Sequence, residues 1–188
     1  MKVVETRLPG VLIIEPRVFD DTRGFFLETW NQARYSALGF SAHFVQDNLS
    51  CSTHGTLRGL HFQHPHSQGK LVYVLQGEVF DVVVDIRVGS PTFGRWVSMV
   101  LSGENKRQLY IPEGFAHGFC VTSEQALLAY KCTALYSPQA EGGILWNDPD
   151  LGIDWPIGTP ILSEKDRHYP CLREIPTGRL PHYLNPQS

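Results

Sequence analysis

The stretch HGTLRGLHFQHPHSQGKLVYVLQG, His54–Gly77, holds four histidines and then runs into the apolar segment Leu71–Leu75. A short apolar run bounded by turn residues is typical of a β-strand, and Gln76–Gly77 supplies the turn that ends it. Histidine is the side chain most often used for proton transfer near neutral pH, and it also binds transition metals. The stretch therefore predicts a strand beside a chemically active loop.

A second stretch, YIPEGFAHGF at Tyr110–Phe119, has the character of a partner to the first. Together the two resemble the halves of the cupin signature, which lies on a small β-barrel. In cupins the first half usually carries two histidines one residue apart, then a glutamate, then a glycine seven positions later. Here the second histidine is missing after His61, and Lys70 occupies the glutamate position. The second half survives as Pro112, Gly114 and His117.

These departures argue against a metal site. A transition metal needs three or four converging His, Cys or carboxylate ligands, and the ammonium of Lys70 would repel a cation. We therefore expect a barrel without a metal, in which His61 is free to act as a base. His64 and His66 fit solvated loop residues. A metal held by His61, His64 and His117 is the alternative.

Composition is that of one ordinary globular domain spanning residues 1–188. Hydrophobic residues make up 42% and charged residues 19%, and the net charge of −3 gives no broad basic field for nucleic acid. The four cysteines contain no Cys-x-x-Cys pair and are expected to be free thiols. The N-terminus MKVVETRLPG lacks an apolar signal core. We expect a cytoplasmic protein with no membrane or nucleic-acid partner.

Many short strands separated by Gly and Pro turns predict an all-β fold, a cupin-like antiparallel jelly-roll barrel. A turn at Asp20–Gly24 leads into a strand within Phe19–Trp30. Short helices are expected at Asn31–Leu38, with Asn31 as N-cap and Gly39 as terminator, and from Ser163. The other expected strands are Val11–Glu15, Phe44–Ser52, Leu57–Phe62, Leu71–Leu75, Val79–Ile86, Phe93–Leu101, Gln108–Ile111, His117–Val121 and Ala126–Thr133.

Two strands carry informative alternation. In Val79–Ile86 the pattern VFDVVVDI predicts a half-buried strand. In Phe44–Ser52, alternation puts Gln46, Asn48 and Ser50 on one face; this face forms a polar ligand wall if it points inward and ordinary surface if it points outward. Ser137–Thr159 is expected to be an ordered loop region over the barrel. The tail from Pro176 is expected to be an extended arm.

Seven phrases in order resemble the dTDP-4-dehydrorhamnose 3,5-epimerase family over about Val11–Asp166. They are DTRGFFLETW, FVQDNLSCS, GTLRGLHFQ, QGKLVYVLQGEVFDVVVDIR, YIPEGFAHGF, GGILWNDPDLGIDWP and LSEKD. The resemblance implies an isomerase without metal or cofactor. Its reaction inverts carbons 3 and 5 of dTDP-4-dehydro-6-deoxy-D-glucose to give dTDP-4-dehydro-L-rhamnose, in dTDP-L-rhamnose biosynthesis. It also implies a homodimer with exchanged N-terminal strands.

The chemistry of that reaction fits the residues. A C–H bond beside a ketone ionises only if the enolate is stabilised, and inversion needs proton removal from one face and delivery to the other. His61 is the expected base. The resemblance implies Asp166 as its dyad partner and Tyr130 as the opposite proton donor. Taken by itself, Asp166 is better explained by helix capping, and Tyr130 by strand packing, in which aromatic residues are usually structural. Lys70 suits the enolate oxygen, or is a solvated strand-end lysine.

The resemblance also implies residues that bind the substrate. Arg23 and Arg58 suit the diphosphate or sugar, because a guanidinium presents forked donors to oxyanions. Phe26 or Tyr136 would stack on thymine or pack in the core. The segment KCTALY before and including Tyr136 departs from the more aromatic run of many family members. The other implied ligand contacts are Glu28, Gln46, Asp47, Asn48, His117, Glu141 and Lys165.

Three other functions fit parts of this sequence. One is an epimerase acting at a single carbon of a related dTDP-4-keto sugar in a secondary-metabolite pathway, which would use the same catalytic residues. Another is a metal-dependent cupin such as a dioxygenase, which would retain stoichiometric iron. The third is a non-catalytic sugar-nucleotide sensor, which would bind without turnover.

Overall fold

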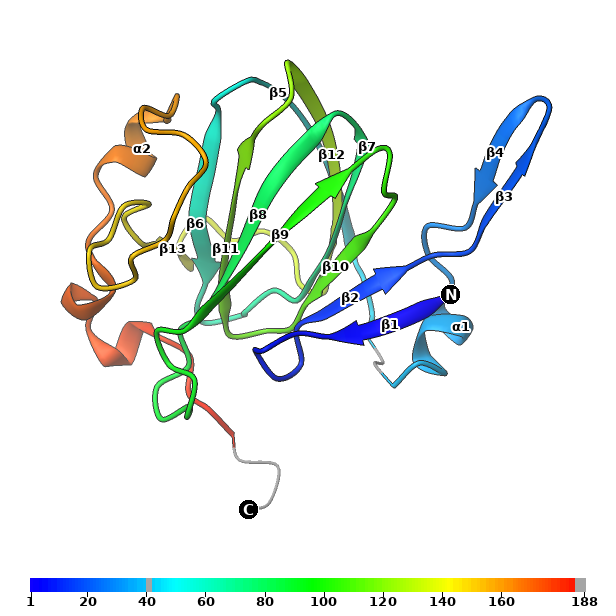
Figure 1. Ribbon diagram of the computed structural model, residues 1–188. Coiled ribbons are helices and arrows are strands. Elements are labelled where there is room, and N and C mark those ends of the chain that lie inside the picture. The colour runs from blue at the N-terminus through cyan, green and yellow to red at the C-terminus, as the bar shows by residue number, and fades with distance from the viewer. Residues whose placement is uncertain (40–41, 185–188) are drawn as a thin grey trace.

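The computed structural model describes residues 1–39 and 42–184, and its regular structure is mostly antiparallel strands. In this part of the chain they form a six-stranded sheet, ordered β1-β2-β10-β7-β12-β5, a five-stranded sheet, ordered β13-β6-β11-β8-β9, and a separate two-stranded sheet, β3-β4. The two larger sheets lie face to face around a shared core (Figure 1). This arrangement is a cupin-like jelly roll and confirms the predicted all-β class.

The predicted strands of the six-stranded sheet are confirmed to within a few residues, and β1 was not predicted. That strand is short, KVVE, and it lies at the sheet edge, where it pairs only with β2 among the described strands. The bounds are β1 (Lys2–Glu5), β2 (Leu12–Glu15), β5 (Gln46–Thr53), β7 (Lys70–Gln76), β10 (Gln108–Ile111) and β12 (Gln125–Cys132).

The five-stranded sheet contains one further strand that the sequence did not predict. Its sequence is EGG, which has neither the apolar character nor the alternation of a strand; it pairs with the edge of β6 inside the region expected to be loop. The bounds are β6 (Leu57–Gln63), β8 (Glu78–Asp85), β9 (Trp96–Ser102), β11 (Phe115–Val121) and β13 (Glu141–Gly143).

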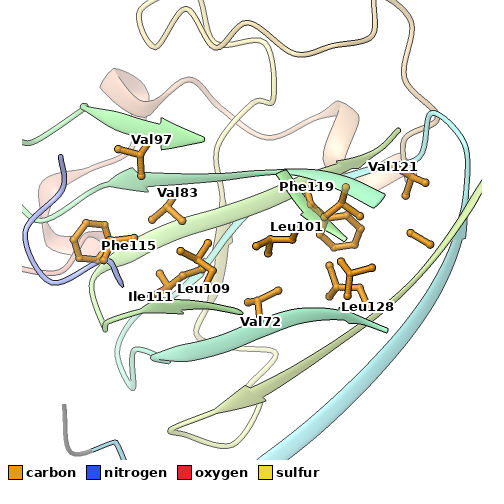
Figure 2. Close-up of a cluster of buried hydrophobic side chains, with 14 of the residues drawn as sticks. Val72, Val83, Val97, Leu101, Leu109, Ile111, Phe115, Phe119, Val121 and Leu128 are labelled. Carbon is orange, nitrogen blue, oxygen red and sulfur yellow. The ribbon is translucent and has the colours of Figure 1, made fainter. Parts of the chain in front are cut away.

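The core between the two sheets is an apolar cluster contributed by both. Figure 2 shows Val72, Leu109 and Leu128 from one sheet meeting Val83 and Phe119 from the other. Each is 5% exposed or less, and burying a side chain of this size contributes roughly 1.5–3 kcal/mol. The cluster therefore fixes the distance between the sheets and the direction in which every inward-facing polar residue points.

The prediction of a half-buried strand at Val79–Ile86 was wrong, because β8 is buried on both faces. Val79 and Val83 belong to the core between the sheets. Val82 and Val84 belong to a second cluster on the outer face of the sheet, where side chains from the C-terminal third of the chain cover them. These covering residues include Ile144, Trp155 and Leu172.

Both predicted helices form and begin at the predicted caps. Asn31 accepts a hydrogen bond from Arg34 N at the start of α1 (Gln32–Ser36), and Ser163 accepts one from Asp166 N at the start of α2 (Glu164–Arg167). The first helix ends at Ser36, earlier than the expected Leu38, with Gly39 following at φ +96°. Among the described residues, no helix is both long and apolar enough to cross a membrane.

A hairpin near the N-terminus projects from the barrel, whereas the C-terminal tail packs against it. Near the N-terminus, β3 (Val18–Asp21) and β4 (Gly24–Leu27) form a hairpin that projects away from the barrel (Figure 1). The tail expected to be an extended arm instead lies against the molecule: Leu180 is buried, and Val88 N donates to Pro181 O at 2.8 Å. Two short 3-10 helices, η1 (Leu172–Glu174) and η2 (Thr177–Arg179), precede this contact.

Candidate active site

A bulge in β6 brings Arg58 and His61 to the same side of the strand. Regular alternation would place residues three apart on opposite faces. The pairing register of β11 with β6 shifts between His117, which lies opposite His61, and Phe119, which lies opposite Arg58. Three residues of β6 thus span the distance that two residues of β11 cover, as in a β-bulge. The bulge lets both side chains serve one site.

His61 forms a close hydrogen bond with Asp166. The distance from His61 Nε2 to Asp166 Oδ1 is 2.5 Å, and the two side chains are 32% and 4% exposed. Burial alone would raise the pKa of Asp166, but the hydrogen bonds from His61 and Ser163 lower it overall. The two roles weighed for this aspartate coexist, because its backbone N–H is capped by Ser163 while its carboxylate binds the imidazole.

Lys70 and Tyr130 lie on neighbouring strands of the other sheet. Their strands pair so that Val72 is opposite Tyr130 and Lys70 is opposite Cys132, and the Lys70 Nζ atom is 5.8 Å from the Tyr130 ring centroid. Burial lowers the pKa of Lys70, although the nearby Cys132, Asp81 and Glu141 oppose this. Lys70 is therefore partly buried, and it is not the solvated strand-end lysine considered above.

Tyr130 is partly buried next to Lys70, between the two sheets. Its ring packs against the core between the sheets, and burial raises the pKa of its hydroxyl, with the charge of Arg58 opposing. Glu141 influences the pKa of Tyr130 and of Lys70, and His61 in turn lowers that of Glu141. The same carboxylate is thus within electrostatic reach of all three residues.

His117 belongs to a second imidazole–carboxylate pair. Its Nε2 atom lies 3.0 and 2.9 Å from the two carboxylate oxygens of Asp81, and both residues are buried. Within residues 1–39 and 42–184, no group of three or more His, Cys, Asp or Glu residues could hold a metal ion. His64 lines a cleft on the outside of the barrel, so the structure does not bring His61, His64 and His117 together as ligands.

The predicted polar face of β5 points inward at Gln46 and Asn48. Their side chains hydrogen-bond each other at 3.0 Å, and Asn48 Nδ2 lies 3.6 Å from the sulfur of the buried Cys132. Asp47, also predicted to contact the ligand, is exposed on the other face of the strand and pairs with Lys131 at 2.9 Å. The inward-facing alternative therefore holds for this strand.

A charged cluster formed by Tyr136, Glu141 and Lys165 links β13 to α2. The Tyr136 hydroxyl donates to Glu141 Oε2 at 2.8 Å, and the Lys165 ammonium contacts the same oxygen. Burial would raise the pKa of Glu141, but these two hydrogen bonds lower it overall. Arg58 lies across the site, donating to Ser52 Oγ on β5 at 3.1 Å. Glu141 on β13 and Lys165 on α2 thus lie on the two elements that flank His61 and Asp166.

Three predicted contacts lie elsewhere in the same chain. Arg23 is exposed on the projecting hairpin, where it pairs with Asp21 at 2.6 Å. Phe26 is 68% exposed on β4. Glu28 accepts a hydrogen bond from Asn31 at 3.2 Å and pairs with Arg34 at 3.3 Å. The structure does not bring these three residues to the interior of their own barrel.

Sequence reasoning missed three residues near the dyad and the Lys70–Tyr130 pair. Asp81 sits on the buried face of β8, and a carboxylate within VFDVVVD was the signal that could have revealed it. Cys132 is 1% exposed and lies two residues after Tyr130 on the inner face of β12. Tyr169 packs edge-to-face on His61, and no sequence pattern indicates this contact.

Known proteins share both the sequence and the fold. A family model described as dTDP-4-dehydrorhamnose 3,5-epimerase matches residues 5–174. A relative of that name from Shigella flexneri is 58% identical over 168 residues, covering 88% of this chain and 93% of the relative.

Two solved structures extend the comparison. The epimerase RmlC from Legionella pneumophila, in complex with dTDP-4-keto-L-rhamnose, has a TM-score of 0.96 and 53% identity over 98% of this chain and 99% of that one. NovW, a 4-keto-6-deoxy sugar epimerase from the novobiocin gene cluster of Streptomyces spheroides, has a TM-score of 0.91 and 42% identity over 97% and 94% of the two chains. The chain therefore belongs to the dTDP-4-dehydrorhamnose 3,5-epimerase family.

Proposed function

We propose that this protein inverts carbons 3 and 5 of dTDP-4-dehydro-6-deoxy-D-glucose, giving dTDP-4-dehydro-L-rhamnose for dTDP-L-rhamnose biosynthesis. The relatives that carry the name of this reaction support the proposal. The observation that carries it is the 2.5 Å hydrogen bond between His61 and the buried Asp166. Lys70 and Tyr130, on paired strands of the other sheet, support it because Glu141 acts electrostatically on both of them and on His61. This combination supplies a base, an acid and a positive charge.

The base acts through one nitrogen of His61. Asp166 is ionised above its lowered pKa, so the imidazole places its proton on Nε2 and donates it to the carboxylate. The lone pair then lies on Nδ1, which removes the proton from the carbon beside the ketone. Asp166 stabilises the imidazolium that results, as in other His–Asp dyads. Positioned general bases of this kind contribute about 10²–10⁴-fold to a rate.

The negative charge moves to the ketone oxygen as the C–H bond breaks. The ammonium of Lys70 stabilises this enolate, and its partial burial strengthens the interaction because less water screens it. Tyr130 then gives its hydroxyl proton to the same carbon from the opposite face, which inverts the centre. The resulting phenolate and imidazolium exchange protons with water and return to their starting states. Solvent hydrogen is therefore incorporated at each inverted carbon.

The sugar nucleotide would be held by polar groups around the dyad. Arg58 suits the diphosphate because its guanidinium presents forked donors. The remaining groups are Gln46, Asn48, His117, Tyr136, Glu141 and Lys165. Arg23, Phe26 and Glu28, on or beside the projecting hairpin, would complete the site of a second subunit. We accordingly propose a homodimer, in which the exposed Phe25 and Phe26 are covered by the partner.

The proposal is tested by supplying dTDP-4-dehydro-6-deoxy-D-glucose in deuterated water together with the reductase that consumes the product and oxidises NADPH. NADPH oxidation with deuterium at both carbons is the expected result. Deuterium at a single carbon would replace the proposal with the single-carbon reaction. Tight binding of dTDP without any exchange would favour a sensor, and activity that depends on retained iron would favour a metal-dependent enzyme.

A further inference from the structure

Tyr169 lies against the base of the proposed reaction. Its ring centroid is 5.8 Å from that of His61, with an angle of 68° between the ring planes. This is the edge-to-face geometry that neighbouring rings prefer. Tyr169 also comes three residues after Asp166, so one segment supplies both the carboxylate that binds the imidazole and the ring that packs on it.

The Tyr169 ring also borders a cleft on the outside of the barrel. This outer cleft, of about 170 Å³, is lined by residues that include Phe62, His64, Glu141, Tyr169 and Arg179, and His61 is not among them. The ring therefore borders both the cleft and the His61 imidazole. Asp166, the partner of His61, is 3% exposed.

The neighbouring strand is shaped to receive this ring. Gly143 on β13 pairs with His61 on β6, and a Cβ atom at Gly143 would overlap the Tyr169 ring. A Cβ atom at the adjacent Gly142 would instead overlap the ring of Phe62. The absence of a side chain at Gly143 therefore makes the space in which Tyr169 reaches His61.

The contact between Tyr169 and His61 is made by the aromatic ring and not by the hydroxyl. The oxygen is buried and makes no hydrogen bond of ordinary geometry in the part of the chain that the structure describes, although the Lys165 ammonium lies close enough to oppose the rise in its pKa. Burial raises the pKa of this hydroxyl to about 12, so it stays protonated at neutral pH. A buried polar group without an ordinary hydrogen bond destabilises the fold. The contact with His61 therefore depends on the ring.

We propose that Tyr169 is a positioning residue, whose ring holds the His61 imidazole in the orientation for proton abstraction and keeps water from the outer cleft off the His61–Asp166 hydrogen bond. This inference rests on the proposed function, in which His61 is the base. Displacing a catalytic group by about 1 Å can lower a rate about 10²-fold. Loss of the ring should therefore act on turnover and leave substrate affinity largely intact.

The experiment compares Tyr169→Phe, which keeps the ring, with Tyr169→Leu, which removes it. Two quantities are measured: kcat and KM with the sugar nucleotide and coupling reductase, and the NMR signal of the His61 Nε2 proton, assigned by its loss in His61→Asn. For Tyr169→Leu we expect kcat to fall roughly ten-fold or more with KM nearly unchanged. We also expect faster exchange of the Nε2 proton with water. Tyr169→Phe should retain both wild-type values.

A matched pair of glycine variants tests the same contact without changing Tyr169. Gly143→Ala should displace the ring and reproduce the Tyr169→Leu results, whereas Gly142→Ala, which meets Phe62, should leave the His61 proton unchanged. If Tyr169→Leu fails to fold, these two glycine variants still test whether the Tyr169 ring positions His61.

Two results would overturn the inference. One is an unaltered kcat and proton exchange in Tyr169→Leu, and the other is equal losses in Tyr169→Phe and Tyr169→Leu. Full activity in His61→Asn would instead contradict the proposed function, and the proton measurement would still report whether the ring shields the hydrogen bond.

Discussion

The Lys70 ammonium and the Tyr130 ring lie 5.8 Å apart, on two paired strands of the same sheet. A cation over an aromatic face is attracted by the ring, yet burial lowers the pKa of Lys70. The site thus keeps an ammonium in an environment that disfavours its charge. Such a group is costly in the free protein and useful when an anion forms beside it.

Replacing Lys70 by methionine should therefore separate activity from stability. We expect Lys70→Met to lower kcat by about 10²-fold or more, because the enolate loses its positive partner. The free energy of unfolding near neutral pH should rise, because no buried charge remains. Urea unfolding and the coupled assay measure the two effects. Lys131→Met is the matched control: this lysine on the same strand as Tyr130 pairs with the exposed Asp47, and its loss should change neither quantity much.

The pH dependence of stability has a defined sign for Lys70. Its pKa is lower in the folded than in the unfolded chain, so the unfolded chain binds more protons between the two values. The free energy of unfolding should then rise with pH across that window, up to the ordinary lysine range. Lys70→Met should lack this rise. Identical slopes for the two proteins in urea titrations at several alkaline pH values would contradict the lowered pKa.

Tyr130→Phe should uncouple proton removal from inversion. Phenylalanine keeps the packing of the ring against the core but has no proton to deliver. We expect net epimerisation to fall by about 10²–10⁴-fold, while His61 still exchanges substrate hydrogen with deuterated water on one face. Mass spectrometry of recovered substrate detects this exchange. Wild-type turnover in Tyr130→Phe would show that another group is the acid.

The same substitution at two buried aspartates should affect different quantities: turnover at Asp166 and stability of the fold at Asp85. Asp166→Asn is expected to lower kcat about 10²-fold or more, because the imidazole loses the carboxylate that orients it. Asp85→Asn breaks a buried network with Arg87, Ser90 and Thr92. It should destabilise the fold by roughly 3 kcal/mol while the folded protein keeps its kcat. Turnover and urea unfolding of both variants make the comparison.

The lowered pKa of Asp166 also predicts behaviour in acid. Because its folded pKa lies below the unfolded value, the carboxylate stabilises the fold above the unfolded pKa. This contribution is lost as the pH falls through the folded pKa. The free energy of unfolding of Asp166→Asn should therefore depend less on pH in this acid range than that of the wild type. Equal acid dependence would show that the carboxylate is not stabilised by the His61 hydrogen bond.

The projecting hairpin provides a test of the proposed dimer. Phe26→Glu places a charge on an exposed aromatic position, where it would be buried only if a second subunit covers it. We expect sedimentation to show a shift toward monomer, together with a rise in KM. Asp150→Lys, on an exposed loop that pairs with Arg173 of η1, changes charge away from this surface and should leave both unchanged. A Phe26→Glu protein with wild-type mass and KM would contradict the shared site.

The sequence by itself determined the class of fold, most strand positions and the helix caps, because these depend on short-range patterns. Alternation in Phe44–Ser52 was enough to group Gln46 with Asn48, and Ser163 was enough to start a helix. The same pattern could not tell which face of the strand points inward. Nor could it reveal β13, since its residues form a strand only because β6 offers an edge to pair with.

Only the tertiary structure decided how the reactive groups meet. His61 and Asp166 are 105 residues apart in the chain, and the contact exists because the C-terminal third packs over the outer face of the sheet. The bulge in β6 turns Arg58 and His61 to the same side against regular alternation. Long-range packing sets these positions, and so the local pattern that fixes each strand carries no information about which distant side chain it will face.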